Sequence, residues 1–270
     1  MSKMDSKILN LGYLDTLART DSPVHRLDPR AKLLTTLFFI VTVVSFDKYQ
    51  ISAMLVFLIF PIAMITLGNL PIGYLLKRVL WIAPFAVMIA IFNPLFDRQV
   101  LCQIGLLHIT GGWISFVSIL LRFFLTVLAA FTLIATTGFY TLGLAMEKIG
   151  VPQIFVMQLL FLYRYGFVLA EETVRMVRAW QLRAPLRKAM SIRTFSTFVG
   201  SLFLRTTDRA RRIYQAMCCR GFEGQIHLSK QLRWTFKDTL FLILSSLFFV
   251  VFRFTNLALV LGHLITGIFQ

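Results

Sequence analysis

Long apolar segments are the feature that most restricts how this chain can fold. Five of them stand out along the sequence, at about residues 33–46, 51–68, 79–96, 113–137 and 238–255. Hydrophobic residues make up 57% of the chain and charged residues only 15%, whereas soluble domains are roughly 45–50% apolar. A soluble fold could not hide so much apolar surface behind so few charges, so the sequence predicts an integral membrane protein.

The lengths of these segments favour helices over strands. A spanning helix needs about 20 mainly apolar residues, and the alternating pattern of a membrane β-barrel is absent from the sequence. We therefore predict an all-α integral membrane protein with five transmembrane helices and a cytosolic part made of amphipathic helices. The apolar tail 256–270 forms either a partial hairpin or a short sixth helix. We therefore expect four regions: a cytosolic N-terminal segment (1–32), a four-helix transmembrane region (33–137), a cytosolic or interfacial coupling-helix region (138–237) and a C-terminal transmembrane region (238–270).

The distribution of positive charge predicts the orientation. Lys and Arg total 28 against 12 Asp and Glu, and 15 of the basic residues fall between 164 and 237: Arg164, Arg175, Arg178, Arg183, Arg187, Lys188, Arg193, Arg205, Arg209, Arg211, Arg212, Arg220, Lys230, Arg233 and Lys237. Basic loops stay on the cytosolic side of a membrane. The N-terminus and this block are thus predicted to be cytosolic, in a multi-pass protein of the bacterial inner membrane. The positive charge also favours contact with the headgroups of anionic lipids. We expect no nucleic-acid partner.

Residues 153–170 are apolar enough to suggest a further span, but two observations argue against one. A crossing there would export the basic block, and it would place Arg164 inside the membrane, where a charge near the bilayer centre costs about 2.5 kcal/mol or more. We predict instead that 153–180 is a long amphipathic helix at the cytosolic face.

A short pattern recurs within the basic block at an offset of 37 residues. Its core is Ala-x-x-x-Arg followed by a small residue, and the two copies are Ala179, Arg183, Ala184 and Ala216, Arg220, Gly221. Positions i and i+4 share a helix face, and Gly is the usual residue after a helix end. Each copy is predicted to present its Arg at a helix tip, as a docking point. The alternative is two surface helices with solvated arginines.

Four other positions stand out for their charge or their place beside a proline. Asp28, Pro29 and Arg30 precede the first apolar segment, where Asp28 either caps the first helix with Pro29 at its first position or ties the N-terminal segment to the cytosolic helices. Arg122 interrupts the fourth apolar segment. An intramembrane Arg is a functional candidate, but one near a helix end reaches the headgroups at little cost.

The sequence shows no catalytic or metal-binding constellation. The four histidines (His25, His108, His227 and His263) are scattered, with no pair at i, i+4. No G-x-x-x-x-G-K-[ST] loop is present, so ATP hydrolysis would have to come from a partner. We expect no cofactor in this chain and no catalytic activity of its own.

Three segments together resemble the transmembrane T component of energy-coupling factor transporters, nearest to its CbiQ/NikQ branch for cobalt or nickel uptake. They are SPVHRLDPRAKLL at 22–34, which contains His25, QLLFLYRYGFVLAEE at 158–172, and the tips AWQLRA and AMCCRGFEG. The resemblance implies a non-catalytic scaffold whose two helix-tip arginines, Arg183 and Arg220, dock on ATPases. The first tip departs from the family pattern because Ala184 and Pro185 follow Arg183 where Arg-Gly is usual.

The resemblance also implies the partners. These are a pair of cytosolic ATP-binding-cassette ATPases similar to CbiO/NikO, which bind ATP and Mg, a substrate-capture membrane protein similar to CbiM/NikM, and a small accessory membrane subunit. Cobalt is the expected substrate, with nickel or a vitamin as alternatives. A stand-alone secondary transporter would instead need polar groups at mid-membrane and inverted repeats, and a lipid-modifying enzyme would need clustered Asp or His.

Overall fold

The computed structural model describes residues 13–47, 50–96, 100–104, 107–183, 191–222 and 233–254. The chain divides into two compact units, one made of Asp15–Gly138 with Leu232–Gln270 and the other of Met1–Leu14 with Phe139–Gln231. We call the first the bundle unit and the second the arm unit. Each is described by itself. The short helix α2 (Tyr13–Leu17) lies at the border between them in the sequence.

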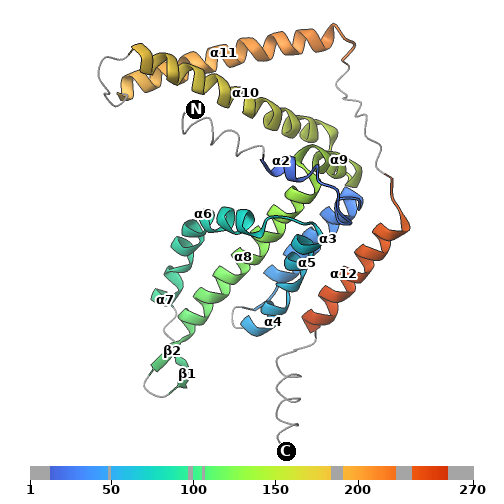
Figure 1. The fold of residues 1–270 in the computed structure, drawn as a ribbon. Coiled ribbons are helices and arrows are strands. Elements are labelled where there is room, and N and C mark those ends of the chain that lie inside the picture. The colour runs from blue at the N-terminus through green and yellow to red at the C-terminus, as the bar shows by residue number, and fades with distance from the viewer. Residues whose placement is uncertain are drawn as a thin grey trace, which may run out of the picture. The chain divides into compact units, whose positions relative to one another are not determined.

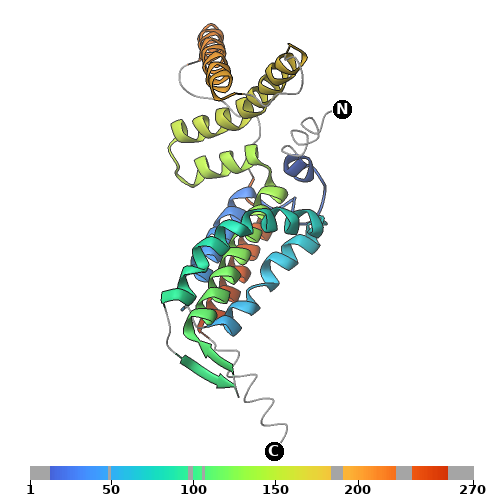
Figure 2. The ribbon, with the colours of Figure 1, turned by 90° about the vertical axis from the view of Figure 1, so that its left-hand side faces the viewer.

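The bundle unit is built from the predicted apolar segments. Its helices are α3 (Pro29–Val44), α4 (Ile51–Val56), α5 (Ile59–Leu67), α6 (Ile72–Ala90), α7 (Phe92–Phe96), α8 (Gly111–Thr137) and α12 (Phe236–Phe254). Helix α8 packs against α3, α4, α5, α6 and α7, and α12 packs on α3. Helix α3 therefore lies beside both α8 and α12, and all three run along the bundle in Figure 2. The second predicted segment is broken into α4 and α5, and the third into α6 and α7.

Phenylalanine forms the centre of the bundle. Phe39, Phe57 and Phe249 are fully buried, and the Phe249 ring centroid lies 5.4 Å from that of Phe39 and 6.0 Å from that of Phe57. The small Ala129 and the aliphatic Leu125 of α8 complete the cluster. Lipid is as apolar as these side chains, so their close packing, not their exclusion from water, holds membrane helices together.

The arm unit contains α9 (Phe139–Ile149), α10 (Gln153–Arg183) and α11 (Ile192–Cys218). Helix α10 is continuous over the whole segment predicted as one long helix. Helix α9 was not anticipated. It packs on α10 with the Phe139 and Tyr163 rings stacked at 4.1 Å between centroids.

The helical fold class is confirmed, with one small β element beside it. Strands β1 (Val100–Ile104) and β2 (Leu107–Thr110) pair antiparallel, with Gln103 opposite His108. They join α7 to α8 and are too short to cross a membrane.

The number of spans stays a prediction. Within the described residues, three stretches are long and apolar enough to cross a membrane, namely Ile72–Pro94, Gly111–Thr137 and Gln153–Arg183. Helix α10 is therefore compatible with a span by length and composition, and its predicted place at the membrane surface depends on the charge argument alone. The predicted tail 256–270 and Ala184 lie outside the described residues.

Candidate functional site

The two predicted docking arginines are both exposed in the arm unit. Arg183 is the last residue of α10, and Ala179 lies one turn before it on the exposed side of the helix. Arg220 follows the end of α11, with Ala216 exposed one turn earlier. Figure 1 shows α11 running back along α10, so that the C-terminal ends of the two helices lie at opposite ends of the pair. The structure therefore presents Arg183 and Arg220 as two separate points.

Gly221 sets the position of Arg220. The Gly221 N–H donates to the Cys218 carbonyl oxygen at 3.0 Å, and the Phe222 N–H donates to that of Met217 at 3.1 Å. Gly221 has φ +80°, the left-handed conformation that glycine adopts readily after a helix end. These two hydrogen bonds form a Schellman motif, in which Arg220 is the residue directly before the left-handed Gly221. The motif ends α11 abruptly and leaves the Arg220 side chain exposed.

An ion pair connects α10 to α11, and a groove lies between the two helices. Arg205 Nη1 lies 3.1 Å from Glu172 Oε1. Beside this ion pair, apolar side chains of both helices line a groove of about 510 Å³, among them Phe161, Tyr165, Leu169, Ile213, Met217 and Phe222. Helix α11 has no buried residue, and its Ile192, Phe195 and Phe203 side chains are exposed. This unit therefore offers apolar surface as well as the arginine tips.

Arg164 lies on the exposed side of α10. Two exposed free thiols, Cys218 and Cys219, lie beside the second tip. A hydrogen bond with the Cys218 thiol raises the pKa of the Tyr214 phenol. The Tyr214 side chain is 61% exposed, so this contact belongs to the accessible surface of α11.

In the bundle unit, the motif around Asp28 organises helix ends. Asp28 caps α3, since its Oδ1 accepts from the Arg30 N–H at 2.8 Å, and Pro29 takes the first helical position. Of the two roles predicted for Asp28, the structure shows the helix cap. The Arg30 guanidinium approaches the Asp28 carboxylate only to 3.9 Å. Arg30 thus acts here mainly through its backbone.

Asp28 is also bonded to a carboxylate 210 residues away. The Asp28 N–H donates to Asp238 Oδ1 at 2.7 Å, and the Thr235 N–H donates to Asp238 Oδ2 at 2.8 Å. Thr235 precedes α12 and Asp238 is its third residue, the arrangement of a capping box. The buried Asp238 side chain therefore accepts bonds at the N-terminal ends of both α3 and α12.

His25 and Lys32 contact the opposite kind of helix end. Lys32 is 1% exposed, and its Nζ donates to the Thr136 carbonyl oxygen at 3.0 Å, in the last turn of α8. The last carbonyls of a helix lack partners within it and carry partial negative charge, which favours cations there. The sequence analysis did not single out Lys32.

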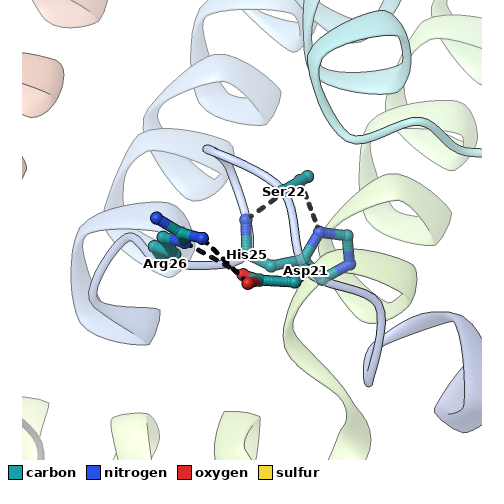
Figure 3. Close-up of polar contacts among 4 residues, drawn as sticks. All are labelled: Asp21, Ser22, His25 and Arg26. Carbon is teal, nitrogen blue, oxygen red and sulfur yellow. Dashed lines mark hydrogen bonds and ion pairs between the residues drawn. The ribbon is translucent and has the colours of Figure 1, made fainter.

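The His25 ring holds the segment before α3. Its Nδ1 lies 2.7 Å from Ser22 Oγ, and its Nε2 lies 3.1 Å from the Leu17 carbonyl oxygen. Figure 3 shows the contact with Ser22 beside the Asp21–Arg26 ion pair. Burial and the Lys32 charge lower the pKa of His25, opposed by backbone carbonyls of Leu17 and Ala135. The neutral ring fits these contacts, because it donates from Nε2 and accepts at Nδ1.

Arg122 lies at the far end of α3. Its Nη2 donates to the Phe46 carbonyl oxygen at 2.6 Å. Arg253 of α12, which the sequence analysis did not single out, donates to the Ser45 carbonyl oxygen at 2.8 Å and lies over the Phe46 ring. Two arginines from two other helices thus satisfy carbonyls at the C-terminal end of α3. This contact gives Arg122 a structural role in addition to the two alternatives of the sequence analysis.

Among the described residues, no three His, Cys, Asp or Glu side chains gather as a metal site would require. The features that remain are two exposed arginine tips with apolar surface between two helices, and a bundle whose helix ends are tied by charged side chains. The exposed tips and the apolar surface beside them are suited to binding other proteins.

Comparison with known proteins gives one matching family model and several similar membrane proteins. The family model described as CbiQ, cobalt transport protein, matches residues 20–233. The energy-coupling factor transporter transmembrane protein EcfT of Limosilactobacillus fermentum is 31% identical over 272 residues, covering 92% of this chain and 98% of the relative. EcfT of Bacillus subtilis is 29% identical, covering 81% of this chain and 88% of the relative. EcfT of Streptococcus thermophilus is also 29% identical, with 83% and 90% covered.

Proposed function

The chain belongs to the CbiQ family, and on this basis we propose that it couples ATPases to a substrate-capture protein. The relatives described above are energy-coupling factor transporter transmembrane proteins. In this role the chain is a non-catalytic membrane scaffold. Its arm unit receives the motion of a cytosolic ATPase pair, and its bundle unit contacts the membrane protein that captures the substrate.

The observation that carries this proposal is the pair of exposed arginine tips. An Arg offers five donors in a planar fork, which suits carboxylate or carbonyl acceptors in a groove of a partner. Arg183 and Arg220 end two different helices, so each could engage one ATPase of a pair. Because Gly221 ends α11 abruptly, Arg220 projects from the tip with little bulk beside it.

The test is a double variant, Arg183→Glu with Arg220→Glu, in the chain co-expressed with its ATPases. Truncating one partner of a buried charge pair typically costs about 2–5 kcal/mol, and reversing its sign adds repulsion. We expect the double variant to insert in the membrane normally but to lose the ATPases on purification. Arg211→Glu is the matched control, since Arg211 is exposed on α11 away from the tip. Full recovery of ATPase with the double variant would refute the docking role.

Cobalt is the substrate we propose, because the matching family model is described as a cobalt transport protein. The relatives carry a name that specifies no substrate. Selection among metals would then lie in the capture protein. Uptake of Co²⁺, Ni²⁺ and a vitamin, measured after co-reconstitution of this chain with ATPases and a capture protein, tests the assignment. Uptake of a vitamin without Co²⁺ uptake would refute it.

The proposed orientation has the N-terminus and the arm unit on the cytosolic side of the inner membrane. Cys218 and Cys219 are exposed free thiols and serve as probes. In a Cys102→Ser background, a membrane-impermeant maleimide should label them in inverted vesicles and not in right-side-out vesicles. Labelling from the outside would contradict this orientation.

A further inference from the structure

Two adjoining grooves lie between α10 and α11 in the arm unit. The first has a volume of about 510 Å³ and is apolar, since of the described residues that line it only Arg209 is charged. The second, of about 710 Å³, is lined by the charged side chains of Glu172, Arg205, Arg209 and Arg212 as well as by apolar ones. Both linings include Leu169, Thr206, Arg209 and Ile213. We call the two together the arm groove, which thus joins an apolar part to a charged part.

The charged residues of the arm groove sum to two net positive charges. Its described lining contains three arginines and one carboxylate, and that carboxylate, of Glu172, is paired with Arg205 at 3.1 Å. Arg209 and Arg212 are exposed, and among the described residues no carboxylate lies within ion-pair distance of either. Asp208 is the one acidic residue of α11. It lines neither part of the groove, and counting it would still leave the sum positive. The arm groove therefore attracts an anionic group.

Helix α11 has the residue pattern of a helix at a membrane surface. Phe195, Val199 and Phe203 recur at every fourth position, so they share one face of the helix, and all three are exposed. The charged residues of α11 are five arginines and one aspartate. An amphipathic helix with Arg on its polar face and Phe on its apolar face is typical of the membrane interface. Helix α10 is itself long and apolar enough to lie in lipid. Both walls of the arm groove are thus suited to contact with lipid.

The α10 wall changes from apolar to charged along the groove. Phe161, Tyr165 and Leu169 line the apolar part, and Glu172 lines the charged part. The steps between these residues are three or four positions, so they follow one face of α10. A lipid that lies along this face would place its acyl chain on apolar side chains and its headgroup beside the arginines.

We propose that the arm groove binds one anionic phospholipid, with its phosphate at Arg209 and Arg212 and an acyl chain along Phe161, Tyr165 and Leu169. The two arginines are three positions apart on α11, so their side chains are neighbours and can donate to the same phosphate. A zwitterionic lipid would bring the positive amine of its headgroup to these arginines, whereas phosphatidylglycerol brings none. Basic pockets between membrane helices are suited to anionic headgroups in the same way.

Native mass spectrometry of the full-length chain in detergent measures this binding, with phosphatidylglycerol, phosphatidylethanolamine or phosphatidylcholine of the same acyl chains added in turn. We expect one phosphatidylglycerol to bind in preference to the other two lipids. Arg209→Gln with Arg212→Gln should weaken its binding about 25-fold, since one basic side chain near a membrane surface contributes about fivefold. Arg209→Lys with Arg212→Lys should retain the preference. The control Arg193→Gln with Arg211→Gln removes the same charge from exposed positions of α11 outside the groove and should change binding little.

A second variant tests the apolar part of the groove without a change of charge. Ala210 is exposed and lines this part, so Ala210→Trp should fold while filling it, and it should lose the retained phosphatidylglycerol. The control Ser196→Trp places the same side chain at an exposed position of α11 outside the groove and should keep the lipid.

Three results would overturn the proposal. The first is equal binding of the three lipids. The second is an equal effect of the two double Gln variants, or of the two Trp variants. The third is an Arg209→Gln, Arg212→Gln chain that keeps its phosphatidylglycerol but no longer co-purifies with ATPases, because the groove would then be a protein interface.

Discussion

Asp238 shows how a single carboxylate stabilises two helix ends. It accepts the Asp28 N–H at 2.7 Å and the Thr235 N–H at 2.8 Å, at the starts of α3 and α12. Both N–H groups lie at helix N-termini, where partial positive charge favours an anion. A buried carboxylate is costly unless it is bonded in this way. At the residue scale, the bundle depends on such paired helix ends.

Asp238→Ala should lower the stability of the chain by about 2–4 kcal/mol, because it removes a cap and leaves two N–H groups without an acceptor. The measurement is the thermal unfolding midpoint in detergent. Asp21→Ala is the matched control, since the Asp21–Arg26 pair is exposed to solvent and its loss should shift the midpoint little. Equal shifts for the two variants would contradict the double-cap role of Asp238.

The lowered pKa of His25 predicts that the stability of the chain depends on pH. Burial and the Lys32 charge lower the pKa of His25 in the folded chain, so the unfolded chain binds the proton more tightly. Stability from His25 is therefore complete above the unfolded pKa of about 6.5 and is lost as the pH falls below it. The unfolding midpoint should drop between pH 7.5 and 5.5 in the wild type and drop less in His25→Gln. The same drop in both proteins would show that His25 is not the group responsible.

At the scale of elements, helices were predictable where the signal is local. Hydropathy located α3, α8 and α12 to within a few residues, and the Ala-x-x-x-Arg pattern located the ends of α10 and α11. The breaks in the second and third segments were not predicted, although Pro61 and Pro94 have no N–H to donate to the carbonyls of Phe57 and Ala90, where α4 and α6 end. Helix α9 was missed although its sequence is amphipathic and Gly150, at positive φ, follows its last residue.

The end of α11 gives the element-scale prediction. Gly221→Ala forces a Cβ into φ +80°, which costs about 1–2 kcal/mol, and it should fray the last turn and increase hydrogen exchange at Cys219–Phe222. Gly200→Ala is the control, because Gly200 lies in the interior of the same helix with free space around a Cβ, where Ala is favoured over Gly. Faster exchange in Gly200→Ala than in Gly221→Ala would contradict the Schellman assignment.

At the scale of the whole molecule, sequence reasoning found the parts but not the ties between them. The contacts from Lys32 to Thr136 and from Asp28 to Asp238 span 104 and 210 residues. Nothing in the local sequence marks which backbone group a distant Lys or Asp will meet. The same holds for Arg122 and Arg253, which meet at the end of α3 from two different helices. The candidate docking tips were predictable because each is a local pattern.

The bundle unit and the arm unit differ in how many of their side chains are buried. The bundle unit has buried polar ties at its helix ends and an aromatic core, whereas α11 in the arm unit has no buried residue. Surface of that kind is available for partners. We therefore expect the chain to function only within an assembly.

Reconstitution shows whether the chain needs both kinds of partner. Co²⁺ uptake into proteoliposomes is measured with the chain alone, with the chain and its ATPases, and with the chain, the ATPases and the capture protein, at saturating ATP. We expect ATP-dependent uptake in the last preparation only, and its loss with the Arg183→Glu, Arg220→Glu variant. Uptake by the chain alone would contradict the scaffold role.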